Sequence, residues 1–205
     1  FAQLLAAVES RRQYAARETR SLGHQLHSEL HDLAAQNFVE RMFDRDPSLW
    51  TDDPSGQEEI KIRMNWLTSP ETSVHLEKVG ADLLAECLSE GYTHAVLLGM
   101  GGSSLAPEVL SLIHKPDKQA LRLLVLDSTD PGQVKTIRES VDLEKSRIIM
   151  TNKSGTTGEI NAFLDYFWSE CSEAFGPQAG EHFIAITDPS TRLETLAKER
   201  GFRKV

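Results

Sequence analysis

The stretch that decides the fold is His94-Ala-Val-Leu-Leu-Gly-Met-Gly-Gly-Ser-Ser104. A short apolar run ends in glycines, and a helical pattern follows at about 105–113. Apolar runs and helical patterns then alternate as far as Val205. Near-continuous apolar strands that alternate with helices are typical of a parallel sheet covered on both faces. The stretch therefore predicts the first strand, and the first strand-to-helix turn, of an α/β domain.

Working outward, the same pattern predicts the rest of the sheet. Further strands are expected at 121–127, 147–151 and 182–187, with 203–205 as the start of a fifth, and helices at 105–113, from Asp130-Pro131 onward, at 156–174, and at 191–200 after Asp188-Pro189. Right-handed crossovers leave few ways to connect such strands. We expect a three-layer α-β-α, doubly wound, flavodoxin-like five-stranded parallel sheet.

Before residue 93 the sequence predicts helices and loops. Leu22, Leu26, Leu30 and Leu33 recur at helical spacing. Residues 44–57 are expected to form a loop, 60–67 a short helix, and 69–89 a longer helix that Gly91 ends. We expect residues 21–71 to be a helical and loop extension, and residues 72–205 to be the α/β domain, cut off in its fifth strand.

Composition narrows the class of protein. The 205 residues carry a net charge of −9, which argues against nucleic acid or an anionic membrane as the main partner. The two cysteines, Cys87 and Cys171, form no disulfide framework or CxxC pattern. No apolar run approaches the roughly 20 residues of a membrane span, and Phe1–Ser10 lacks the basic start of a secretory signal. We expect a cytoplasmic, reduced protein.

Two strand ends are unusually polar or glycine-rich. Loop 1, residues 99–104, reads Gly-Met-Gly-Gly-Ser-Ser, and loop 2, residues 151–157, reads Thr-Asn-Lys-Ser-Gly-Thr-Thr. Each precedes a predicted helix, whose N-terminal N–H groups attract anions. In a flavodoxin-like sheet the first and third strands are neighbours, so both loops open at one edge. The two loops predict a shared anion site, most naturally for a phosphate.

Two other interpretations remain open from the residues alone, and a third is excluded. Ser103 could simply cap a helix, and Thr156 with Glu159 fits a capping box. A dinucleotide site would use Asp127 for a ribose, but Ser104 stands where its fingerprint needs Gly or Ala. A mononucleotide phosphate loop is excluded, because no Gly-Lys-Ser or Gly-Lys-Thr follows the glycines.

A metal site is disfavoured. His27 and His31 share one face of a predicted helix, but Glu29 lies on another face and no third ligand is evident. We expect a solvated helix surface there, and no metal.

The motifs resemble those of the phosphoglucose isomerase family. Val96–Glu108 resembles its first phosphate loop and Asn152–Glu159 its second, while Asp127–Pro131 and Ile186–Ser190 match other strand ends in order and spacing. The resemblance covers about residues 60–205 and implies the family's sugar isomerase (SIS) domain. It also implies interconversion of glucose 6-phosphate and fructose 6-phosphate, with no cofactor.

The resemblance implies which residues hold the substrate phosphate. They are Gly102, Ser103, Asn152, Lys153, Ser154, Thr156 and Thr157. The family often has Ser where Asn152 stands. Its catalytic arginine, glutamate, histidine and lysine lie further along the chain than Val205, so the resemblance implies no catalytic residue here. We expect this chain alone to bind sugar phosphate weakly and to be inactive.

The wording of the motifs is most similar to the isomerase half of transaldolase–phosphoglucose isomerase fusions. Phe1–Arg11 is similar to the last helix of a transaldolase, so residues 1–20 are expected to be its tail. The family implies a homodimer in the full protein. Two further hypotheses stay open: a non-catalytic SIS module that senses a sugar phosphate, and a dinucleotide-binding oxidoreductase domain.

Overall fold

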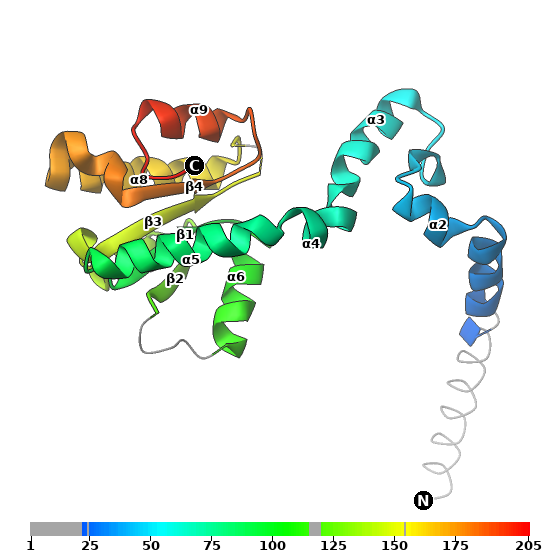
Figure 1. The fold of residues 1–205 in the computed structure, drawn as a ribbon, viewed down its shortest axis with the longest axis horizontal. Helices are drawn as coiled ribbons and strands as arrows, with labels where there is room; N and C mark the ends of the chain where they lie inside the picture. The colour runs from blue at the N-terminus through cyan, green and yellow to red at the C-terminus, as the bar shows by residue number, and fades with distance from the viewer. Residues whose placement is uncertain (1–21, 24, 115–119, 154) are drawn as a thin grey trace, which may run out of the picture. The chain divides into compact units, whose positions relative to one another are not determined.

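The computed structural model describes residues 22–23, 25–114, 120–153 and 155–205 (Figure 1). It divides into two units, one that ends at Leu76 and one that spans Glu77–Val205. Two parts of the sequence-based expectations, the transaldolase-like residues 1–20 and the candidate site residue Ser154, lie outside the described residues.

Four parallel strands form the sheet of the second unit. They are β1 (His94–Leu98), β2 (Arg122–Leu126), β3 (Ser146–Thr151) and β4 (Phe183–Ile186), in the spatial order β2-β1-β3-β4. This order confirms the flavodoxin-like prediction. In the described part of the chain, the sheet has four strands rather than five, and the predicted start of a fifth strand at 203–205 is present as an isolated parallel bridge between Ile184 and Lys204. Two backbone hydrogen bonds join this segment to β4, one from the Ala185 N–H to the Lys204 carbonyl at 2.9 Å and one from the Arg203 N–H to the Phe183 carbonyl at 2.9 Å.

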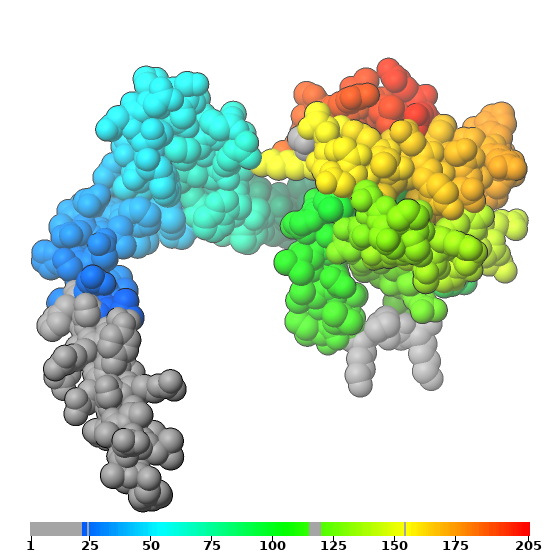
Figure 2. Space-filling view, turned by 180° about the vertical axis from the view of Figure 1, so that it is seen from behind, coloured from blue at the N-terminus to red at the C-terminus, as the bar shows by residue number. Residues whose placement is uncertain are grey.

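Helices cover both faces of the sheet, as predicted for a three-layer fold. They are α5 (Val74–Ser89), α6 (Gly102–Ile113), α7 (Pro131–Glu139), α8 (Gly158–Phe175) and α9 (Arg192–Glu199). The strands, α7, α8 and α9 share one buried apolar cluster. On the other face, Leu83, Leu84 and Cys87 of α5 line a cleft with Ile149 and Ile184. Figure 2 shows α9, in red, beside α8, in yellow to orange.

The core depends on α8, which follows loop 2. Phe163 and Phe167 of this helix are 2% and 0% exposed and belong to one cluster with Ile148 and Met150 of β3. Burial of one such side chain contributes about 1.5–3 kcal/mol. The helix that starts at the candidate site is therefore fixed to the strand that leads into it.

Helix starts in this unit follow local capping chemistry. The Asp130 carboxylate accepts a hydrogen bond from the Gln133 N–H at 3.0 Å, which confirms the predicted start of α7. For α9 the predicted range 191–200 agrees with the helix and its two caps, but Asp188-Pro189 does not form the cap. Ser190 adopts a left-handed φ of 63°, and the Thr191 hydroxyl accepts the Glu194 N–H at 3.2 Å instead.

The first unit is more helical than its sequence predicts. Residues 25–35 are helical, and α2 (Phe38–Phe43), η1 (Pro47–Leu49), α3 (Pro54–Arg63), η2 (Met64–Thr68) and α4 (Ser69–Thr72) follow. The predicted loop at 44–57 is wrong, because Asp53 and Pro54 begin α3 as cap and first residue, with the Gly56 N–H 2.6 Å from the Asp53 carboxylate. The predicted helix at 69–89 is two helices, α4 and α5, separated at Ser73.

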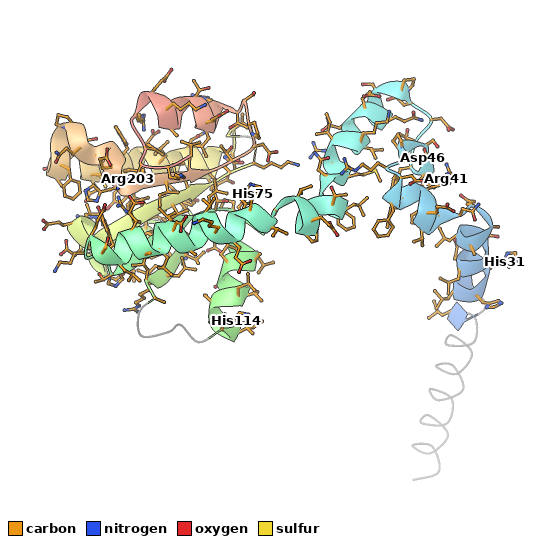
Figure 3. All side chains as sticks on the ribbon, viewed as in Figure 1. His31, Arg41, Asp46, His75, His114 and Arg203 are labelled. Atoms are coloured by element: carbon orange, nitrogen blue, oxygen red, sulfur yellow. The ribbon has the colours of Figure 1, made fainter. Side chains whose placement is uncertain are left out.

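Polar contacts hold the turns of this first unit. Arg41 donates to the Asp46 carboxylate at 2.8 Å, and both residues are labelled in Figure 3. Arg45, with a left-handed φ of 57°, donates to the Asn65 amide oxygen at 3.0 Å and to the Thr68 hydroxyl at 2.6 Å. These bonds join α2, η1 and η2 without a large apolar core. Among the described residues, no helix is both long and apolar enough to cross a membrane.

A buried arginine, Arg147, connects the sheet of the second unit to the segment between α5 and β1. The Arg147 side chain on β3 is 2% exposed, stacks over the Tyr92 ring at 3.8 Å, and pairs with the Glu90 carboxylate at 2.7 Å. Arg203, labelled in Figure 3, contacts Glu86, Glu90 and Glu181. This ion network holds α5 against the last residues of the chain. Because the Arg147 side chain is buried whereas Glu90 is 38% exposed, loss of Glu90 would leave a buried positive charge without its carboxylate partner.

His182 lies beside this network at the start of β4. It is 8% exposed, and its ring stacks on Phe175 at a centroid distance of 3.9 Å. Burial lowers the pKa of His182 below its ordinary value, a backbone hydrogen bond with Ser146 acts against this, and the charge of Arg147 lowers the pKa further. The imidazole therefore binds a proton less readily in the folded protein than in the unfolded chain.

The lowered pKa of His182 predicts acid sensitivity. Because the unfolded state binds the proton more readily, the free energy of unfolding should fall as the pH drops below the unfolded pKa of about 6.5, until the folded pKa is reached. Urea unfolding at several pH values should show a smaller slope in this range for His182→Gln than for the unchanged chain. The matched control is His75→Gln, at an exposed position of α5. Equal slopes in all three proteins would contradict this assignment.

Candidate functional site

Loops 1 and 2 leave neighbouring strands at the same edge of the sheet. The parallel register pairs Leu98 of β1 with Met150 of β3, so Gly99 and Thr151 come next on each strand. A Cβ atom added to Gly99 would lie 2.8 Å from the Thr151 methyl carbon and 3.0 Å from the Ser103 carbonyl. Only glycine fits this approach. The predicted meeting of the two loops at one strand edge is therefore confirmed where they begin.

Loop 1 presents an open helix N-terminus. Gly101, with a φ of 57°, is the N-cap of α6 and contributes no side-chain bond. The Gly102 N–H has no hydrogen-bond acceptor among the described residues. Ser104 is buried, and its hydroxyl donates to the Gly101 carbonyl at 3.0 Å. Ser103 is half-buried and lies inside the helix, so its interpretation as the cap is wrong.

Loop 2 is organised by Asn152. This side chain is 6% exposed, and its Oδ1 atom accepts the Gly155 N–H at 3.1 Å and the Thr157 hydroxyl at 3.4 Å. The Asn152 N–H donates to the Ile186 carbonyl at 3.0 Å. Asn152 therefore bends the loop around its own amide and ties the loop to the end of β4.

The helix after loop 2 starts one residue later than the capping-box interpretation requires. Thr157 is the N-cap of α8, and its side chain makes no capping hydrogen bond. Thr156 and Lys153 are exposed. The capping box of Thr156 with Glu159 is therefore wrong. The N-terminus of α8, like that of α6, is not closed by a side chain of its N-cap.

Residues at the start of α9 and just before it pack against loop 2. Gly155 has a φ of 71°, and a Cβ atom there would lie 2.6 Å from the Leu193 backbone nitrogen. The Thr187 hydroxyl donates to the Lys153 carbonyl at 3.4 Å and lies 2.8 Å from the Thr191 hydroxyl. The sequence analysis gave Thr187, Thr191 and Leu193 no role in the site. Thr187 lies in the motif Ile186–Ser190, which was the available signal, whereas no motif marks the contact of Leu193 with loop 2.

The arrangement suits an anion better than a cation. Two helix N-termini, one exposed lysine and several hydroxyls lie at one strand edge, where dipoles and N–H groups favour negative charge. Six of the residues predicted to hold the phosphate lie in the described part of the chain, directly after β1 or β3: Gly102, Ser103, Asn152, Lys153, Thr156 and Thr157. No cluster of three metal-ligating side chains occurs among the described residues. His31 lies 3.8 Å from Asp32 on an exposed surface.

Fold and site together define the class of protein. The sheet order and the paired loops are those of a doubly wound α/β domain with two strand-to-helix turns at its switch point. The family model described as phosphoglucose isomerase matches residues 77–200, more than half of the 205-residue chain. The chain belongs to the phosphoglucose isomerase family.

Curated relatives of this chain are named glucose-6-phosphate isomerase. The chain is 27% identical over 141 residues to the glucose-6-phosphate isomerase of Thermus thermophilus, covering 68% of this chain and 33% of that protein. It is 32% identical over 145 residues to the glucose-6-phosphate isomerase of Rubrobacter xylanophilus, covering 66% and 31%. The chain spans about a third of the length of these relatives.

Solved structures share the fold. A hypothetical protein of Thermus thermophilus superposes with a TM-score of 0.62 at 22% identity, over 85% of this chain and 40% of that one. A glucose-6-phosphate isomerase of Chlamydia trachomatis superposes with a TM-score of 0.56 at 22% identity, over 80% and 29%. These likenesses confirm the α/β architecture.

The contact between Gly155 and Leu193 gives a test of how loop 2 is held. Gly155→Ala should lower the free energy of unfolding by about 1–3 kcal/mol, because it combines a left-handed φ with a backbone clash. The matched control is Gly158→Ala, since nothing lies within 4 Å of its added Cβ and its backbone is helical. Urea unfolding measures both. Equal effects of the two alanines would show that α9 does not support the loop.

Proposed function

We propose that this chain is the phosphate-binding half of an aldose–ketose isomerase that interconverts glucose 6-phosphate and fructose 6-phosphate. The observation that carries the proposal is the pair of helix N-termini, of α6 and α8, that open from the adjacent strands β1 and β3. Membership of the phosphoglucose isomerase family supports the choice of substrate.

A bound phosphate needs direct contacts with nearby residues, because the net charge of the chain repels anions. Its net charge is −9, so a phosphate must be held by short-range contacts. Lys153 supplies the fixed positive charge of loop 2, and the two helix dipoles add to it. Hydroxyl donors come from Ser103, Thr156 and Thr157, and a backbone N–H comes from Gly102. The family motif assigns a hydroxyl donor to Ser154 as well.

Asn152 contributes chiefly through shape. Its amide oxygen is engaged by the Gly155 N–H and the Thr157 hydroxyl, which fixes the curve of the loop around the proposed phosphate. A serine at this position, as the family often has, is too short to bridge the same two donors. The proposal therefore assigns Asn152 to the site as the residue that orients its neighbours.

The chemistry of such an isomerase is proton transfer between C2 and C1 of the opened sugar through a cis-enediol. It needs general acid and base groups and a cation near the enediolate. Held by its phosphate, the sugar is positioned for these groups, which converts binding energy into orientation. We assign no catalytic residue in this chain, and the 205 residues alone should bind substrate without isomerising it.

The wider organisation is part of the proposal. Residues 72–205 are the SIS domain, residues 21–71 its helical extension, and residues 1–20 the end of a preceding transaldolase in a bifunctional protein. The family relationship supports a cytoplasmic homodimer as the assembly that acts. The transaldolase assignment rests on Phe1–Arg11 alone, and those residues lie outside the described part of the chain.

Lys153 provides the direct test. Lys153→Ala should weaken binding of fructose 6-phosphate by about tenfold or more, because it removes the charged donor of loop 2. The matched control is Lys145→Ala, since Lys145 is equally exposed but precedes β3 and so lies at the other end of that strand. Titration calorimetry with fructose 6-phosphate measures both variants.

Two further titrations separate the competing functions. Fructose without its phosphate should not bind, and neither should NAD or NADP. Binding of a dinucleotide in place of the sugar phosphate would favour the oxidoreductase interpretation. Unchanged affinity in Lys153→Ala would move the phosphate site away from loop 2. Sugar-phosphate binding without isomerisation by the full-length protein would favour a sensor.

A further inference from the structure

A polar cavity lies between loop 2, α8 and α9. Its volume is ≈ 140 Å³, and Asn152 and Gly155 of loop 2 form one wall. Figure 2 shows the two helices that form the rest of it, α9 in red beside α8 in yellow to orange. Neither α6 nor Lys153 contributes to its lining. The cavity therefore shares Asn152 with the proposed sugar-phosphate site but includes neither Lys153 nor α6.

Charged groups face this cavity without internal partners. Asp165 of α8, Arg192 of α9 and Arg200 at its end line the cavity, together with the Asn161 amide. Among the described residues, none of these three charged side chains lies within 4 Å of an opposite charge or makes a side-chain hydrogen bond. Elsewhere on α9, Lys198 pairs with Glu194 at 2.6 Å. The cavity thus concentrates unused hydrogen-bonding capacity with a positive excess.

Arg200 is held ready for an acceptor. Its guanidinium carbon lies 4.5 Å from the centre of the Trp168 ring, which fixes the plane of the group. Its Nη1 atom is buried and has no hydrogen-bond partner among the described residues. A buried donor left unpaired costs about 1–3 kcal/mol, more when it is charged. An anion in the cavity would remove that cost.

We propose that this cavity is a second binding site for a small hydroxylated anion, held through its carboxylate or phosphate group. Arg200 and Arg192 bind the anionic group, and the Asn161 amide and Asp165 carboxylate bind its hydroxyls. The volume is about ten times what one water needs, so it fits a molecule of a few heavy atoms. Two arginines suit the planar, multidentate oxygens of either group.

Site-resolved titration tests this proposal. Amide signals of the ¹⁵N-labelled 205-residue chain are followed during addition of inorganic phosphate and, in a separate series, of glycerate. One or both anions should shift the amides of Asn161, Leu193 and Leu196, and the stronger of the two identifies the group that the cavity prefers. No shift at these positions with either anion would overturn the proposal.

Variants assign the response to the cavity. Arg200→Met keeps the apolar stem on Trp168 and removes the guanidinium, so the affinity should fall by about tenfold or more. Arg192→Met, at an exposed position, should weaken binding in the same direction and covers the case in which Arg200→Met does not fold. The control is Lys198→Met, which removes a positive charge from the same helix outside the cavity. An equal loss in the control would overturn the proposal.

The two sites fail independently. Lys153→Ala should abolish shifts at Gly102 and Ser103 and leave those of Leu193 and Leu196 in place. Loss of both responses in Lys153→Ala would show a single site at loop 2 and would refute the cavity. A response confined to α9 would support the cavity and refute the proposed phosphate grip.

Discussion

The parallel pairing of β1 with β3 is the constraint on which the rest of the structure depends. Its register sets Leu98 opposite Met150, so both strands end at the same edge and release their loops side by side. Gly99 then approaches the Thr151 side chain more closely than any other residue type would permit. Without that pairing, the N-termini of α6 and α8 would not lie at the same edge of the sheet.

The loops are fixed before any ligand arrives. Loop 2 is curved by Asn152, tied to β4 through the Ile186 carbonyl, and packed on the Leu193 backbone. Preorganisation of this kind reduces the entropy lost on binding. Asn152 and Gly155 of the same loop also line the polar cavity between α8 and α9.

Much of the sheet could be predicted from the sequence, because apolar runs and the cap at Asp130 act locally. Predictions failed where one signal has two meanings: Asp53-Pro54 starts a helix, whereas Asp188-Pro189 does not. For the site, the sequence located both loops. The hydrogen bonds of the Asn152 side chain within loop 2 depend on packing that spacing does not encode, and so does the placement of Asp165 and Arg200 around one cavity.

Because Gly155 packs closely on Leu193, substitutions in loop 2 and at the start of α9 are coupled. In a homologue with a side chain at position 155, the start of α9 must also shift, because the Leu193 backbone nitrogen leaves no room for a Cβ atom. Aligned homologues should therefore show paired changes at these two places, and the shape of loop 2 should differ between the resulting groups.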